Sequence, residues 1–180
     1  TCALPIFSDD QNVKKITLSA SLQGFEQVAI SYQLEKSNGE LIIAYAFTKQ
    51  PIREKESLHL AIPLSLKNSV WQYGDDSLMI EYGKDQLPGS NFDFICAEEQ
   101  LTCASSAGRF TIHSSGPNLF EIGDRTNEKK IMGAKKWRSS PINSSLAFLY
   151  VLNNYWHTNY KADQEGKIEF TLRLSGSYSE

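Results

Sequence analysis

The sequence has few of the residues that mark several classes of protein. It contains only three cysteines, Cys2, Cys96 and Cys103, an odd number that is too small for a disulfide framework. Their spacing matches no zinc-binding pattern. Lys and Arg total 18 against 21 Asp and Glu, the formal net charge is −3, and no basic run is dense enough to follow a phosphate backbone. We therefore expect no nucleic-acid partner.

Long apolar segments are also missing. The longest apolar run, Leu146 to Leu152, is far shorter than the ~20 residues that span a bilayer. The first eight residues lack the basic and apolar regions of a signal peptide. We expect a soluble protein with no membrane partner, and its compartment stays open. The chain begins with Thr1 and not with Met, so we also expect it to be part of a longer protein.

No motif in the sequence predicts a self-sufficient active site. A Gly-x-Ser-x-Gly elbow, a Walker loop and a Rossmann glycine pattern are all absent. The three histidines, His59, His113 and His157, lie in separate segments, and none has a second metal-ligating residue two or four positions later. We expect no metal or cofactor in this chain. His59 and His113 fall on the polar side of their segments, which favours exposed or inter-sheet imidazoles.

Apolar and polar residues alternate from one end of the chain to the other, which is typical of half-buried strands. The alternating segments are 16–22, 28–34, 41–47, 58–66, 78–82, 92–96, 110–112 and 168–174. Pro63 removes a hydrogen-bond donor and predicts an edge strand or a bulge. The run 146–152 is compatible with a strand or a short helix, and we favour a strand. The pattern predicts an all-β fold, an antiparallel β-sandwich in one domain over residues 1–180. Residues 125–140 are expected to form a long exposed loop.

The segment 152–166 combines planar amides with aromatic rings. Such residues suit a sugar-contacting surface, because rings stack on a pyranose while amides bind its hydroxyl groups. A turn-rich corner, in which the amides bind backbone groups, is the alternative interpretation. The segment reads Asn153-Asn-Tyr-Trp-His-Thr-Asn-Tyr-Lys-Ala-Asp-Gln-Glu-Gly166 and is followed by Ile168-Glu-Phe170.

These residues closely resemble a motif in the C-terminal β-domain of glycoside hydrolase family 38, the α-mannosidases. Three further stretches resemble that domain in the same order along the chain. They are Lys55 to Pro63, Asp85 to Asn91, and Gly108 to His113 continuing through Leu119 to Asp124. Together the four stretches cover about residues 48 to 174, whereas the first 47 residues carry no recognisable signature.

The resemblance implies a large antiparallel β-sandwich of the mutarotase-like supersandwich type. Members of the family hydrolyse α-mannosidic bonds in a separate α/β barrel that holds the catalytic Asp and a zinc ion. Nothing in these residues matches that barrel, so no catalytic or metal-binding residue carries over. The resemblance implies that the chain alone is inactive, that zinc belongs to the missing barrel, and that the barrel is its partner.

Loops of the family's β-domain pack on the barrel, and some approach the substrate cleft. From loop position and residue chemistry, we predict a group of side chains close to mannose-containing glycans. The candidates are Asp85, Asn91, Trp156, His157, Asn159 and Tyr160. Two alternatives remain open at this stage. The chain could be a freestanding carbohydrate-binding module that uses the cluster around Trp156, or a purely architectural or oligomerising sandwich with an exposed apolar patch.

Overall fold

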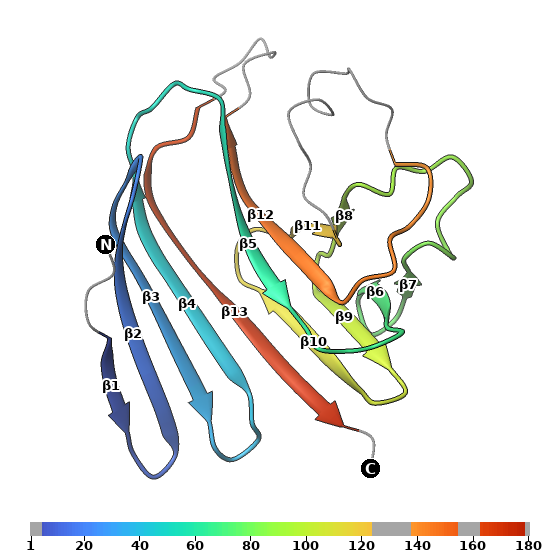
Figure 1. Cartoon of the computed structure of the whole chain (residues 1–180), viewed down its shortest axis with the longest axis horizontal. Helices are drawn as coiled ribbons and strands as arrows, with labels where there is room; N and C mark the ends of the chain where they lie inside the picture. Colours follow the sequence, from blue (N-terminus) through green and yellow to red (C-terminus); the bar gives the residue numbers. More distant parts are fainter. Residues whose placement is uncertain (1–4, 124–137, 155–162, 179–180) are drawn as a thin grey trace. The chain divides into compact units, whose positions relative to one another are not determined.

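A computed structural model describes residues 5–123, 138–154 and 163–178 of the chain. All regular structure in these residues is β-strand, and the strands form two antiparallel sheets of nine and four strands (Figure 1). The predicted all-β fold with antiparallel sheets is therefore confirmed. The chain divides into two compact units, the first of residues 1–58, 113–116 and 152–176 and the second of the remainder. The single domain over residues 1–180 stays a prediction.

The first unit is built on an antiparallel meander. The strands are β1 (Ile6–Asp9), β2 (Val13–Leu22), β3 (Phe25–Glu35), β4 (Leu41–Lys49) and most of β13 (Gly166–Tyr178). Each of the first four strands pairs with the next, and β13 returns to pair with β4. The turn at Ser37 to Gly39 joins β3 to β4, and in it the N–H of Gly39 donates to the carbonyl of Glu35 at 2.8 Å.

The alternating pattern gives this sheet one apolar face. Ile16 pairs with Tyr32, Tyr32 with Ile43, and Ile43 with Leu172, so one apolar row crosses four strands. Paired residues in antiparallel strands point to the same side of the sheet. The next row, Leu18, Ile30, Tyr45 and Phe170, is also apolar, whereas the row on the other side begins with Lys14, which pairs with Leu34.

The second unit contains strands from both sheets. From the nine-stranded sheet come most of β10 (Gly108–Ser114), then β9 (Gln100–Ser105), β6 (Val70–Gly74) and β7 (Met79–Glu81). The four-stranded sheet has the order β5 (Glu56–Pro63), β12 (Leu146–Asn154), β11 (Leu119–Ile122) and β8 (Ile95–Cys96). The β5 strand lies at the edge of its sheet, as Pro63 predicts, and the strand predicted at 146–152 is confirmed as β12.

The core of the second unit is formed by fully buried apolar side chains. Trp71, Leu101, Ile112, Phe120 and Leu149 are each at most 2% exposed. The buried indole of Trp71 donates from Nε1 to the carbonyl oxygen of Ser144, just before β12, at 2.5 Å. The indole N–H is the one polar group of this large core side chain, and a buried donor without a partner is costly. The bond to the carbonyl removes that cost.

The structure corrects the expected strand at 92–96, of which only Ile95 and Cys96 are strand. The Oδ1 atom of Asn91 accepts a bond from the N–H of Asp93 at 2.6 Å, and the buried Asp93 carboxylate accepts from the N–H of Arg138 at 2.9 Å. These bonds bend the backbone away from an extended ladder. Four strands that alternation did not predict are also present, namely β1, β6, β9 and β11.

Two further observations bear on the sequence-based expectations. Cys96 is exposed on β8, Cys103 is buried on β9 in the other sheet, and both are free thiols. Most of the expected loop at 125–140 lies outside the described residues. Within the described ranges, the structure contains no helix of the length and apolarity needed to cross a membrane.

Candidate functional site

The main polar site of the first unit lies where the chain leaves β12 and where it returns toward β13. Asn154 is 2% exposed, and its Nδ2 donates to the carbonyl of Ile52 and to Oε1 of Glu56, both at 3.0 Å. Its Oδ1 accepts from the N–H of Gln164 at 3.0 Å. With Lys49, these residues are called the Asn154 cluster below. Asn154 immediately precedes the aromatic segment 155–162, and its bond to Gln164 therefore joins the two ends of that segment.

Lys49 and Glu56 form the charged part of the Asn154 cluster. The Lys49 ammonium has no exposed area and lies 2.5 Å from Oε1 of Glu56, whose side chain is 25% exposed. It also donates to the carbonyl of Gln50 at 2.8 Å and lies 5.3 Å from the ring centroid of Phe25. A buried ammonium is tolerated only when it is paired and hydrogen-bonded, so these contacts explain how Lys49 can be buried at the end of β4.

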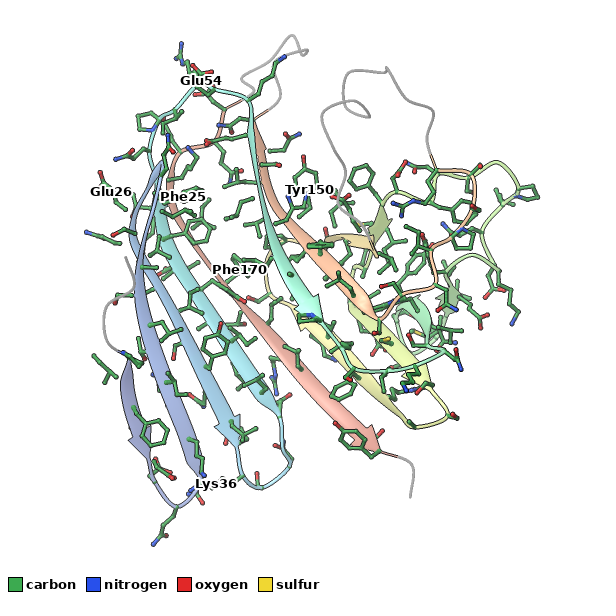
Figure 2. The ribbon with its side chains drawn as sticks, in the orientation of Figure 1. Phe25, Glu26, Lys36, Glu54, Tyr150 and Phe170 are labelled. Atoms are coloured by element: carbon green, nitrogen blue, oxygen red, sulfur yellow. The ribbon has the colours of Figure 1, made fainter. Side chains whose placement is uncertain are left out.

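Neighbouring contacts join this cluster to the turn between β2 and β3. The N–H of Gln50 donates to the carbonyl of Gly24 at 3.0 Å, and its side-chain amide donates to Glu26 at 2.8 Å. Phe25 and Glu26 lie toward the same end of the first unit as Glu54 (Figure 2). These bonds connect the turn between β2 and β3 to the segment that follows β4, so this end of the unit is held by side-chain and backbone hydrogen bonds together.

A second buried polar pair lies on the four-stranded sheet of the second unit. The Nε2 atom of His59 is 2.8 Å from Oε1 of Glu121, and the two side chains are 4% and 1% exposed. The ring of Tyr150 stacks on His59 with centroids 4.4 Å apart and planes 9° apart. Burial, and then the Glu121 carboxylate, raise the pKa of Tyr150 to about 12. His59 is therefore not exposed, which corrects one of the two alternatives expected for it.

The sequence-predicted residues Asp85 and Asn91 are both described, and each stabilises its own loop. The Asp85 carboxylate accepts from the N–H of Glu81 at 2.9 Å, and the Asp85 N–H donates to the Glu81 carbonyl at 3.1 Å. Asn91 accepts from Asp93, as described above. Burial, and secondly the Asp85 carboxylate, raise the pKa of Tyr73 on β6. Their contact with glycans stays a prediction.

The other predicted residues, Trp156, His157, Asn159 and Tyr160, lie outside the described residues. Their grouping with Asp85 and Asn91 at one cleft therefore also stays a prediction. In the part of the chain that the structure describes, no three or more His, Cys, Asp or Glu side chains are grouped so as to hold a metal ion.

The sequence contains a signal for the Asn154 cluster that the motif search missed. Lys49 continues the apolar alternation of Tyr45 and Phe47, and Glu56 continues that of Leu58. A charged residue at the inward position of a strand end predicts a buried pair, because an unpaired charge there would be too costly. Asn154 belongs to the family-like motif, but nothing in its neighbours indicates which carbonyls it binds.

Comparisons with known proteins add little to this geometry. No family model matches the sequence, and no curated protein matches it. The chain is similar to the crystal structure of a heparan sulfate lyase HepC mutant from Pedobacter heparinus, with a TM-score of 0.45 and 8% sequence identity. The similarity covers 99% of this chain and 22% of that chain, so this chain spans less than a quarter of that protein's length. A likeness of this degree assigns no function.

Proposed function

We propose that this chain is a non-catalytic β-sandwich region of a larger α-mannosidase-like glycoside hydrolase. Its role is to support a catalytic α/β barrel, and its loops form one wall of a mannoside cleft. Catalysis and zinc belong to the barrel. The proposal starts from the four stretches that resemble the β-domain of glycoside hydrolase family 38.

One observation carries the proposal: stretches of the resemblance that are far apart in the sequence meet in buried polar pairs. Glu56 of the first stretch binds Asn154 of the last, 98 positions later, at 3.0 Å. His59 of the first stretch lies 2.8 Å from Glu121 of the third, 62 positions later. An accidental resemblance gives no reason for its polar residues to contact one another. These pairs therefore support a shared structural framework.

The chemistry of these pairs favours support over catalysis. A carboxylate that attacks or protonates a glycoside must reach the sugar. The Glu121 side chain is 1% exposed and bonds to His59, and Glu56 bonds to both Lys49 and Asn154. In these positions, the carboxylates compensate buried cationic and amide groups, which is a stabilising role.

A hydrolysis assay with an aryl α-mannoside and zinc tests the catalytic part of the proposal. We expect no turnover by this chain, and turnover that a chelator abolishes would contradict a non-catalytic role. The coding sequence upstream of Thr1 is the second test. We expect it to encode a barrel with Asp and His zinc ligands, and we expect the longer protein to lose its activity when residues 1–180 are deleted. An upstream sequence without such a barrel would refute the proposal.

A freestanding carbohydrate-binding module is the second candidate, and the Asn154 cluster favours it. The bond between Asn154, which precedes the segment 155–162, and Gln164, which follows it, would lower the entropy cost of ordering that segment on a ligand. Calorimetric titration with mannose oligosaccharides separates the candidates, with Trp156→Ala as the test variant. Saturable binding that the variant loses favours the module, and no binding favours the supporting region.

A further inference from the structure

On the apolar face of the first unit, the exposed fraction of the side chains rises from β13 to β1. Along one row of paired residues, Leu172 on β13 is 0% exposed, Ile43 and Tyr32 are half-buried, Ile16 is 38% exposed and Phe7 is 60% exposed. Figure 1 shows β1 to β4 side by side in this order. Leu34 and Leu22 on the same face are 38% and 47% exposed. The side chains on the β1–β3 part of this face are called the apolar face below.

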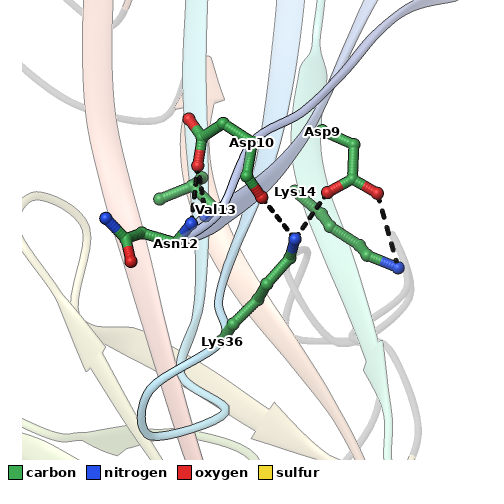
Figure 3. Close-up of polar contacts among 6 residues, drawn as sticks. All are labelled: Asp9, Asp10, Asn12, Val13, Lys14 and Lys36. Atoms are coloured by element: carbon green, nitrogen blue, oxygen red, sulfur yellow. Dashed lines mark hydrogen bonds and ion pairs between the residues drawn. The ribbon is translucent and has the colours of Figure 1, made fainter.

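The strand at the edge of the apolar face is held firmly against its neighbours. Asp10 accepts bonds from the N–H groups of Asn12 and Val13 at 2.8 and 2.7 Å, which closes the turn between β1 and β2. The Lys36 ammonium, from the turn after β3, lies 2.6 Å from Asp9 and also donates to the Asp10 carbonyl (Figure 3). The Lys36 ammonium lowers the pKa of Asp9. The edge strand therefore presents its apolar side chains in fixed positions.

The apolar face is large enough for a stable dimer. Its four most exposed apolar side chains present roughly 370 Å², if a fully exposed large side chain has about 200 Å². With the half-buried apolar side chains of the same face, the exposed apolar area is roughly 600 Å² on each partner. This value is near the lower end of the range for specific interfaces. This area lies at the upper end of what the largest apolar patch of a monomeric protein exposes, and patches of that size are often interaction sites.

We propose that the apolar face binds the same face of a second copy of this chain, around a two-fold axis. Two sheets that pack face to face need matching apolar surfaces whose side chains interdigitate about 10 Å apart. A second copy presents such a surface by symmetry, with the same size and the same side chains. The product is a sandwich in which the second layer over β1–β3 comes from the partner. This inference does not depend on the proposed glycoside hydrolase function.

Sedimentation equilibrium over about 1 to 300 μM protein tests the inference, a range that brackets a micromolar dissociation constant. We expect the mass to rise from the monomer value of 20.2 kDa toward twice that value. Phe7→Ser and Ile16→Ser remove apolar area from the face, and each should raise the dimer dissociation constant about ten-fold or more. Ile6→Ser is the matched control, because Ile6 is 73% exposed on the same strand but points to the opposite side of the sheet. It should change the constant by less than about two-fold.

Three outcomes would overturn the inference. The first is a monomer at every concentration. The second is equal weakening by Ile6→Ser and Phe7→Ser, which would indicate pairing of β1 edges instead of face packing. The third is a dimer that neither Phe7→Ser nor Ile16→Ser weakens. Circular dichroism checks that each variant folds, and Leu34→Ser replaces any variant that does not, because it removes area from the same face on β3.

Discussion

Replacing Asn154 by alanine should destabilise the first unit strongly for such a small change. The substitution removes three hydrogen bonds of 3.0 Å and leaves the Ile52 carbonyl without its donor. Each buried polar group that loses its partner costs about 1–3 kcal/mol. The Gln164 backbone is exposed and can bind water, and Glu56 keeps its contact with Lys49, so their losses are smaller. The expected decrease in the free energy of unfolding is therefore about 2–3 kcal/mol.

Urea denaturation followed by circular dichroism measures this decrease. With a slope of about 2 kcal/mol per molar, the midpoint should fall by roughly 1 M at an unchanged slope. Asn153→Ala is the matched control, because it is the same substitution at the neighbouring, exposed position. It should change stability by less than about 0.5 kcal/mol. Equal effects of the two variants would refute the reasoning, because the buried bonds of Asn154 would then contribute nothing particular to stability.

Three further predictions follow from the described contacts. Glu121→Leu leaves the buried His59 imidazole without its partner and should lower the unfolding free energy by about 1–3 kcal/mol in denaturant titrations. Burial raises the pKa of Tyr45 to about 12 from 10.0, so the folded state holds this proton more tightly than the unfolded state does. The contribution of Tyr45 to stability should therefore be constant below pH 10 and fall between pH 10 and about 12 in alkaline unfolding experiments. Gly74→Ala should cost more in thermal melts than Gly39→Ala, because both have positive φ but only at Gly74 would the new Cβ lie 2.1 Å from a backbone oxygen.

Alternation predicted the strands that have one buried and one exposed face, and it failed where that contrast is missing. All four residues of β1 are exposed, with Ile6 and Phe7 on opposite sides of the strand, so no period of two appears there. In β11, the last three residues are all buried. Glu121 does alternate with Phe120 and Ile122, but four residues are too few for a period of two to stand out. These strands could be located only after their neighbours were in place.

The site was predictable only where local backbone chemistry decides it. Asp85 and Asn91 bond to backbone groups within four positions, as Asp and Asn in turns commonly do. The strand parity of Lys49 and Glu56 points to a buried pair, but it does not identify which two residues form it. The partner of a buried charge depends on which connections converge at one end of the sheet, and this is a property of topology.

His59 shows how a correct strand assignment can lead to a wrong environment. Its position alternates with Leu58 and Leu60, so parity places it on the polar side of β5, and sequence reasoning allowed an exposed imidazole there. Parity separates the two faces of a strand, but it does not state what covers each face. Tyr150 stacks on the imidazole and Glu121 binds its Nε2, so the polar side of β5 is also buried at this point. A buried imidazole needs a polar partner. Glu121 supplies it and is itself buried, although its neighbours Phe120 and Ile122 are core residues.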